Sequence, residues 1–149
     1  MKTKFLIVLI SIAPLYSFGQ HSLWSNDTAS KRIMQNDCDD KIFTKVENIA
    51  SLNVSTSHFG DTLLSFLKSK KAFRNGDKIK FKFIVTNHSQ IFDITKESGE
   101  VKKEDIAKEA ILKFSSFWNP AVQNGRAVCS YVKLEMDFQD NILYVSITQ

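Results

Sequence analysis

The clearest alternation of apolar and polar residues is KIKFKFIV, from Lys78 to Val85, in which lysines alternate with large apolar side chains. This period of two predicts a β-strand with one buried face. The lysine face can be an anion-binding patch or the solvated side of a one-sided sheet, and we favour the second. After a turn at 87–90, a second strand is expected from Ile91 to Thr95, and Ser98-Gly99 should end it.

Two segments carry apolar residues at helical spacing. The apolar stripe between Phe59 and Leu67 predicts a helix over about 56–71. A second helix is predicted over 102–117, because acidic residues in its first turn suit the helix dipole. It should stop before Asn119-Pro120, since a residue that precedes proline disfavours the helical conformation.

The last third of the chain alternates again. Val128 to Phe138 predicts a long strand, which Asn124-Gly125 should introduce with a turn. Asp140-Asn141 predicts a tight reversal, and Ile142 to Ile147 has strong strand propensity. Two strands joined by so short a connection pair with each other, so a hairpin is expected at the end of the chain.

The predicted order is helix, strand, strand, helix, strand, strand, preceded by an extended or irregular segment at 41–52. Strands joined by short turns or by one helix favour an α+β fold, with an antiparallel sheet of three to four strands and two helices packed on one face. The residues expected to fill the core are Ile79, Phe81, Phe83, Val85, Ile106, Ala110, Phe114, Val132, Leu134 and Met136.

The first twenty residues, MKTKFLIVLISIAPLYSFGQ, have a short basic start, an apolar run and a small-residue end. This pattern predicts a secretory signal peptide that is cleaved near Gly19-Gln20. A membrane anchor would need about 20 apolar residues, and Pro14 interrupts this run. We therefore expect an exported protein, periplasmic or secreted, with a loose polar arm at 21–37 and one domain over 38–149.

Net charge limits the kinds of partner to be expected, and the cysteine content raises the question of a disulfide. The chain has 20 Lys and Arg, and loss of Lys2 and Lys4 with the signal peptide leaves 18 against 16 acidic residues. This weak balance gives no reason to expect nucleic-acid binding. The two cysteines, Cys38 and Cys129, can form a disulfide in an oxidising compartment or remain free thiols, because sequence does not give their separation.

Residues that could carry catalysis are few. His21, His58 and His88 stand apart, no spacing typical of metal ligands occurs, and no glycine-rich phosphate loop is present. Cys129 lies in mid-strand, where a packed or bridged cysteine is more common than a nucleophile. We therefore expect a protein that is not an enzyme and that uses no cofactor or metal.

One stretch is specific enough to suggest a family. The run AILKFSSFWNPAVQNGRAVCSYVKLEMDF, Ala110 to Phe138, resembles the C-terminal domain of TonB, in the form common in exported proteins of Bacteroidetes. That family has a helix ending in Trp-x-Pro-Ala, then Asn-Gly, then a strand that starts with Val and ends with Phe. The matching residues are Trp118, Pro120, Ala121, Asn124, Gly125, Val128 and Phe138.

Some features depart from the family. Ala72-Phe73 replaces a Tyr-Pro pair before the first strand, and a hairpin glycine is missing near Ser89. A TonB proper has an N-terminal membrane anchor and a long proline-rich spacer, whereas this chain has a predicted signal peptide and two prolines. The resemblance is therefore to a stand-alone copy of the domain.

The resemblance implies a protein-interaction domain that binds an extended peptide by strand addition. The partner would be an outer-membrane receptor or another envelope protein, with a possible link to transmembrane transport. The docking edge implied by the family lies on the strand after the Trp118 corner, and its residues here are Ala127, Cys129, Tyr131, Lys133 and Glu135. Trp118, Pro120, Asn124 and Gly125 are expected to have a structural role instead, with the Trp118 ring folded over the sheet edge at the helix end.

Two alternatives remain open from the residues. The chain could be a small secreted enzyme or a small-ligand carrier that uses Cys129 or a cavity near Trp118. Within the interaction hypothesis, the tail at Ile142–Ile147 should pair with the expected docking edge and occupy it. Either this tail is a displaceable plug, or partners use another surface, such as the edge of the Ile91–Thr95 strand.

Overall fold

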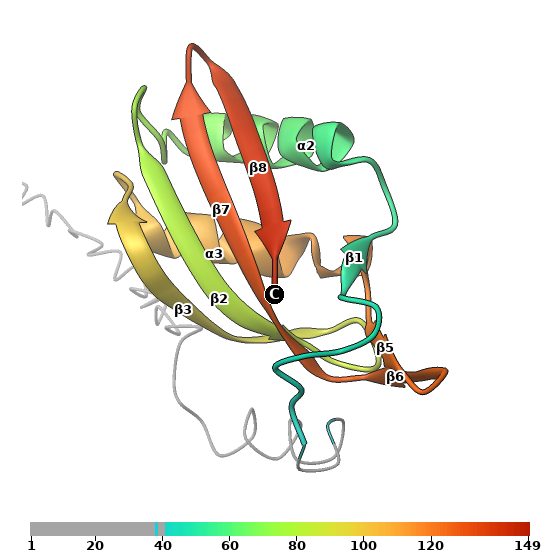
Figure 1. Ribbon diagram of the computed structural model, residues 1–149. Helices are drawn as coiled ribbons and strands as arrows, with labels where there is room; N and C mark the ends of the chain where they lie inside the picture. Colours follow the sequence, from blue (N-terminus) through green and yellow to red (C-terminus); the bar gives the residue numbers. More distant parts are fainter. Residues whose placement is uncertain (1–37, 39–40) are drawn as a thin grey trace, which may run out of the picture.

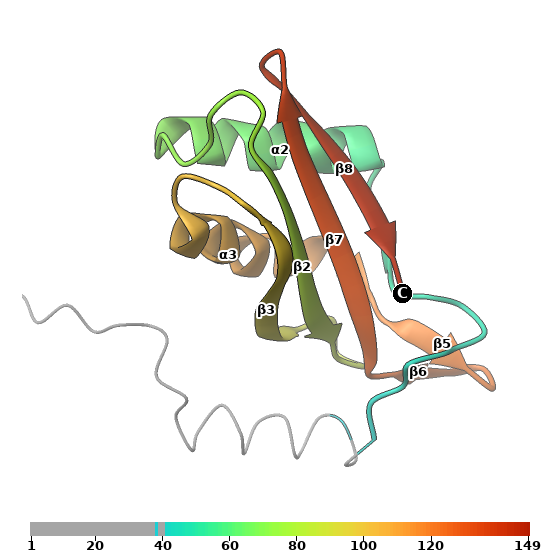
Figure 2. The ribbon, with the colours of Figure 1, turned by 60° about the vertical axis from the view of Figure 1, so that its left-hand side comes forward.

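The computed structural model describes Cys38 and residues 41–149, so the predicted signal peptide and polar arm lie outside the described residues. Four antiparallel strands form the main sheet in the order β3-β2-β7-β8. Two helices, α2 and α3, lie side by side across one face of this sheet, and the other face is left without helices (Figures 1 and 2). The predicted α+β fold with both helices on one face is confirmed.

The main sheet consists of β2 (Lys78–Val85), β3 (Ile91–Glu100), β7 (Ser130–Gln139) and β8 (Ile142–Thr148). The helices are α2 (Thr56–Ser69) and α3 (Glu104–Lys113), and a 3-10 turn, η1 (Ser115–Phe117), follows α3. Two small two-stranded sheets are also present: β1 (Ser51–Leu52) pairs with β4 (Trp118–Asn119), and β5 (Ala121–Gln123) pairs with β6 (Arg126–Val128).

Helix α2 starts where a cap is available and packs through one stripe. The Ser55 hydroxyl oxygen accepts a hydrogen bond from the His58 amide (3.2 Å), which satisfies one amide of the first turn. Phe59, Leu63 and Leu67 are fully buried against the sheet. Gly60 lets the helix come close to β8, because a Cβ atom there would lie only 3.2 Å from the Leu143 carbonyl oxygen.

Helix α3 is shorter than predicted. It begins at Glu104 without a side-chain cap and ends at Lys113, after which Phe114 leaves the helical conformation. The 3-10 turn then places Trp118 in an extended conformation, where it pairs with Leu52 of β1. A helix continuing to residue 117 would prevent this pairing, so a tertiary contact shortens the helix that periodicity predicts.

Strand β3 is longer than predicted, because Gly99 does not end it. Gly99 adopts φ +82° inside the strand, and a Cβ atom there would overlap the Lys78 carbonyl oxygen of β2. The pairing with β2 also shifts register twice, so that β3 carries extra residues at Glu97 and around Asp93. These are β-bulges, and Asp93 adopts φ +52° at one of them.

The long strand predicted from Val128 is divided at Cys129. Asn124 and Gly125, both with positive φ, form the predicted turn, but it joins the short strands β5 and β6 instead of leading directly into β7. At the other end, Asp140 and Asn141 have φ +48° and +65° and form the tight turn of the predicted β7–β8 hairpin.

The core lies between the two helices and the sheet. The predicted core residues are buried with two exceptions, Ile106 and Phe114, which are only half-buried at the border of the core. Trp118 was expected over the sheet edge, but it lies inside, with edge-to-face contacts to Phe59 and Phe83 at centroid distances of 5.9 and 5.3 Å. Its 1% exposure makes it the largest fully buried side chain in the described part of the chain.

Candidate functional site

Strand β7, which carries most of the docking edge implied by the family, is an interior strand. On one side it pairs with β2 along its length, and on the other side its residues Lys133–Gln139 pair with β8. Lys133 lies opposite Thr148, and Glu135 lies opposite Ser146. The prediction that the tail occupies this edge is confirmed.

The start of β7 is covered by a different segment. The Phe43 amide donates to the Cys129 carbonyl oxygen (2.9 Å), and the Tyr131 amide donates to the Phe43 carbonyl oxygen (3.2 Å). Ala127 lies in β6, opposite Val122 of β5. Four of the five predicted edge residues, Cys129, Tyr131, Lys133 and Glu135, are therefore covered by other backbone segments of the chain, and Ala127 lies in the β5–β6 hairpin.

A disulfide holds this covering segment in place. Cys38 and Cys129 are bridged, with their Cα atoms 5.5 Å apart, which decides the question that the sequence left open. The bridge lies over Ile84, which is 1% exposed, and Ile42 and Tyr131 complete this small apolar cluster on the sheet face opposite the helices. Cys129 accordingly presents no thiol for the enzyme alternative.

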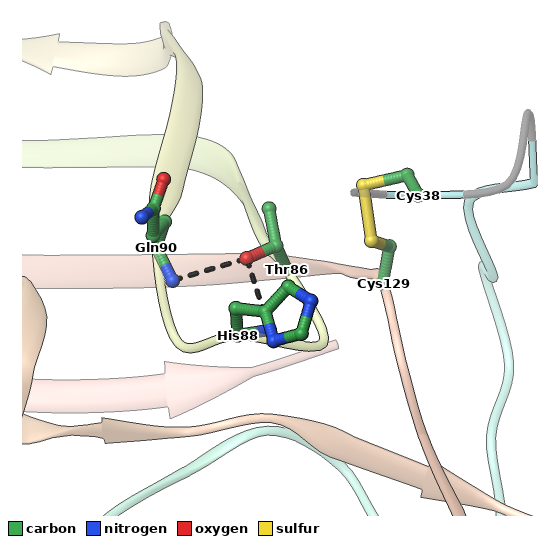
Figure 3. Close-up of a disulfide and its surroundings, with 5 residues drawn as sticks. All are labelled: Cys38, Thr86, His88, Gln90 and Cys129. Carbon is green, nitrogen blue, oxygen red and sulfur yellow. Dashed lines mark hydrogen bonds between the residues drawn. A yellow bond between two sulfur atoms is a disulfide. The ribbon is translucent and has the colours of Figure 1, made fainter. Parts of the chain in front are cut away.

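Figure 3 shows the disulfide beside the turn that follows β2. The buried Thr86 hydroxyl oxygen accepts hydrogen bonds from the amides of His88 (3.2 Å) and Gln90 (3.1 Å). His88 thus belongs to a structural turn, and the His58 ring lies near Phe117 at the start of α2. Among the residues that the structure describes, no group of three His, Cys, Asp or Glu side chains could hold a metal ion.

The lysine face of β2 is matched by acidic residues on β7. The Lys78 ammonium lies 2.7 Å from Glu135 and 3.4 Å from Asp137, and Lys80 lies 3.8 Å from Glu135. Lys82 stands over the Tyr131 ring, 4.0 Å from its centroid. The hydrogen bond from Lys78 lowers the pKa of the Glu135 carboxyl and raises the pKa of Lys78 itself. These lysines therefore form a charge-paired sheet face.

A hollow lies on the helix side of the molecule. A hollow of about 510 Å³ lies along the outer face of α2, lined by His58, Asp61, Thr62, Ser65, Phe66, Ser69 and Phe114. It is wide open to solvent, and its polar groups lie in a row along one helix and do not converge on a point. It is a surface hollow separate from Trp118, which is enclosed by its aromatic neighbours.

The two outer strands of the main sheet, β3 and β8, differ in how they are protected. Four of the ten residues of β3 are charged, and two bulges interrupt its pairing. The seven residues of β8 include no charge and no proline, and its pairing with β7 is regular from end to end. Charges and bulges are the features that keep edge strands from recruiting other strands, and β8 has neither.

The geometry of the β7–β8 turn defines which groups of β8 face outward. A two-residue turn is closed by a hydrogen-bonded pair, here Gln139 and Ile142. Pairs alternate from there, so the amides and carbonyls of Leu143, Val145 and Ile147 point away from β7. Within the described residues, no further strand pairs with β8 on that side.

No family model matches the chain, and neither a curated protein nor a solved structure matches it. The resemblance to the TonB C-terminal domain thus depends on the sequence pattern alone, chiefly on the residues from Ala110 to Phe138 and more weakly on the hairpin pattern upstream. In the described part of the chain, no helix has the length and hydropathy needed to cross a lipid bilayer.

Proposed function

We propose that this chain is an exported, non-enzymatic interaction domain, similar to the TonB C-terminal domain, that binds an extended segment of an envelope protein by strand addition. The observation that carries the proposal is the outer edge of β8, which is regular and uncharged and which no other strand of the described residues pairs with. A partner strand there gains main-chain hydrogen bonds, and neighbouring side chains supply its specificity.

The side chains around this edge suit an added strand on both faces. On the solvent side, Ile142 and Tyr144 are 50% and 55% exposed, unusually high for large apolar residues. On the helix side, Val145 and Ile147 are half-buried at the border of the core. A partner with apolar residues at alternate positions would cover both sets, and cross-strand pairs of this kind each contribute roughly 0.2–1 kcal/mol.

The proposed edge differs from the one that the family resemblance implies. In this chain, Lys133 and Glu135 are covered by β8, and Cys129 and Tyr131 are covered by the segment at Phe43. A peptide would have to displace one of these segments to reach them, and Leu143 of β8 is buried in the core. Pairing within the chain has the entropic advantage of a two-residue loop, so an incoming peptide finds the outer edge of β8 more accessible.

Export is part of the proposal because two observations agree on it. The first twenty residues have the pattern of a secretory signal peptide. The Cys38–Cys129 disulfide is of a kind that persists in oxidising compartments and is rare in the reducing cytosol. Mass spectrometry of the native protein tests this directly: a chain that begins near Gln20 and carries the bridge is expected, and an intact Met1 would contradict it.

The test of binding uses the outward-facing amides. Ile147→Pro removes an amide that points away from β7, so it should block strand addition while the β7–β8 hydrogen bonds remain. Ile147→Ala is the matched control, because it also removes the Ile147 side chain beyond Cβ but keeps the backbone amide. The mature wild-type chain, immobilised and mixed with the envelope fraction of its own organism, should retain a membrane protein.

We expect Ile147→Ala to retain the same partner and Ile147→Pro to lose it. Both variants must show the circular dichroism of the folded protein for the comparison to count. Equal capture by both would show that the partner does not add to β8, and no membrane-protein partner for the wild type would contradict the proposed function as a whole.

A further inference from the structure

Two Asn-Gly pairs occur in the chain, Asn75-Gly76 and Asn124-Gly125, and each lies in an exposed turn with a positive φ at the glycine. In such a pair the glycine amide nitrogen can attack the asparagine carboxamide, because glycine has no side chain to keep the two groups apart. We infer that Asn124 is a site of spontaneous modification in the folded protein, where its carboxamide becomes a carboxylate, and that the fold protects Asn75. This inference goes beyond the proposed function and does not depend on it.

The reaction needs only water. The Gly125 nitrogen loses its proton to solvent base and forms a bond to Asn124 Cγ, and the carboxamide nitrogen leaves as ammonia. The product is a cyclic imide. Water then adds to one of the two imide carbonyl carbons, and the ring C–N bond breaks as the nitrogen regains a proton. Depending on which carbonyl reacts, the result is aspartate, or isoaspartate, in which the main chain runs through the former side-chain carboxyl.

At Asn75-Gly76 both reacting groups are held by hydrogen bonds. Asn75 Oδ1 accepts a hydrogen bond from the Asp140 amide (2.7 Å), which ties the carboxamide to the β7–β8 turn. The Gly76 amide donates to the Phe138 carbonyl oxygen at the end of β7 (2.8 Å). Both bonds must break before the imide ring can close, and each lowers the population of chains that can react by several-fold.

At Asn124-Gly125 both groups are free. Within the described residues, neither the Asn124 carboxamide nor the Gly125 amide makes a hydrogen bond. A Cβ atom on Gly125 would meet no heavy atom within 4 Å, and the same holds for Gly76, so hydrogen bonding and not space distinguishes the two sites. The turn joins β5 and β6, of three residues each, so a change of its conformation for ring closure disturbs few backbone pairs.

The same turn fastens the segment at 41–50, which covers the start of β7, to the β5–β6 hairpin. The Glu47 carboxylate accepts hydrogen bonds from the Asn124 amide (3.0 Å) and the Gln123 side chain (3.3 Å), and the Glu47 amide donates to the Gln123 side chain (3.1 Å). A carboxylate on residue 124 would add a second negative charge beside Glu47, and like charges repel. The isoaspartyl form also lengthens the main chain, so it cannot keep the backbone of this two-residue turn.

Modification should therefore loosen this segment where it meets the hairpin. Next to Glu47, Asn48 pairs with Val122 of β5 through two backbone hydrogen bonds of 3.1 and 2.9 Å. The Cys38–Cys129 disulfide keeps the start of the segment attached to β7. The expected change is thus a local opening at Glu47 and Asn48, and the rest of the segment stays in place.

The first test follows both asparagines in one molecule. The mature chain, folded and with its disulfide intact, is kept in mildly alkaline buffer, and peptide mapping by mass spectrometry measures the loss of each carboxamide over time. We expect conversion at Asn124 to be at least about tenfold faster than at Asn75, because two hydrogen bonds protect Asn75. Once the chain is reduced and unfolded, the two rates should be similar. Equal rates in the folded chain, faster conversion at Asn75, or an Asn124 that reacts only after unfolding would overturn the inference.

The second test measures the consequence with variants that fix the charge. In Asn124→Asp, hydrogen exchange at the Asn48 and Val122 amides should be faster than in the wild type. Adding Glu47→Gln removes the repulsion and keeps an oxygen that accepts from the amide of residue 124, so exchange should slow again. Asn75→Asp is the matched control, because it adds the same charge at the opposite end of β7 (Figure 1). Exchange in Asn124→Asp equal to that in this control would refute the loosening of the segment.

Discussion

The two outer strands of the main sheet, β3 and β8, end the same sheet but differ in composition and geometry. β3 carries two bulges, a positive φ at Asp93 and charges at four positions, and Lys96 forms an ion pair of 2.9 Å with Glu104 of α3. β8 has a regular register, no charge and two large apolar side chains exposed to solvent. β3 therefore has the features that keep an edge strand from pairing further, and β8 lacks them.

This difference also bears on the docking edge that the family resemblance implies. The matched segment ends at Phe138, whereas β8 begins four residues later and takes the outer position. Adding one strand to a sheet moves the accessible edge outward by one strand. In this chain, the residues with the family pattern shape the core, and the edge available for docking belongs to the tail.

Deletion of Ile142–Gln149 should have the largest effect on this comparison. It removes the buried Leu143 and uncovers the long, regular edge of β7, which has buried apolar residues at alternate positions. Loss of Leu143 alone should cost about 2–5 kcal/mol, as large-to-small core changes do. We expect lower thermal stability together with stronger peptide binding or self-association, measured by light scattering and peptide titration.

A truncated chain that stays folded and monomeric and binds peptides no better than the full chain would contradict this expectation. In that case β8 would only be a fourth strand of the sheet. The matched control is Ile147→Pro in the full chain, which alters the outer edge of β8 and leaves β7 covered.

Trp118→Ala tests whether a loss of stability alone changes the behaviour of the edges. Trp118 bridges Phe59 of α2 and Phe83 of β2 and is fully buried, so the substitution should cost about 3–5 kcal/mol. Association through β8 should persist below the lowered melting temperature, because no residue of β8 changes. Unchanged thermal stability with altered partner binding would show that Trp118 acts in binding, in contrast to its position in the core.

Gly99→Ala tests the protection of β3. The new Cβ atom would overlap the Lys78 carbonyl oxygen, and the positive φ of residue 99 disfavours alanine. We expect a loss of about 1–3 kcal/mol, the usual scale for local backbone strain, with faster hydrogen exchange in the second half of β3. Gly76→Ala is the control, since it also has positive φ but no heavy atom within 4 Å of its added Cβ. An equal loss of stability in both variants would show that the close approach of residue 99 to the Lys78 carbonyl does not affect stability.

Mild acid should have the smallest effect, and it should act on the ion pairs of Glu104 in α3 and Glu135 in β7. Hydrogen bonds from Lys108 and Lys96 lower the pKa of the Glu104 carboxyl, and the bond from Lys78 lowers that of Glu135. A carboxyl whose pKa is lowered by folding stabilises the folded state at pH values above its ordinary pKa, near 4.5. This stabilisation is lost as the pH falls through the folded pKa. These pairs are mostly solvent-exposed, so each contribution is small.

Thermal melts from pH 6 to pH 3 measure this loss. Glu104→Gln and Glu135→Gln should each reduce the acid sensitivity slightly. β8 contains no carboxylate, so envelope-partner capture through its outer edge should change little over the same range. Loss of capture near pH 4.5, in the wild type and in both variants, would contradict an uncharged contact.

The class of fold and most of its helices and strands could be predicted from the amino-acid sequence alone. Local patterns each predict one kind of element: strands from the alternation in 78–85 and 128–138, and a helix from the apolar stripe of 59–67. The structure contains the corresponding strands and helix. The turn residues Asn124-Gly125 and Asp140-Asn141 also act locally, because their backbone conformation requires residues that tolerate positive φ. The hairpin, and with it the covered edge of β7, could therefore be predicted from sequence.

The features that depend on contacts between distant segments are visible only in the folded chain. The Cys38–Cys129 bridge requires a Cα separation that no spacing along the chain gives. The end of α3 at Lys113 depends on the pairing of Trp118 with Leu52, and the role of Gly99 depends on the carbonyl of Lys78. Which strand forms the outer edge is likewise a property of the assembled sheet, because an edge exists only once every other strand has found its neighbours.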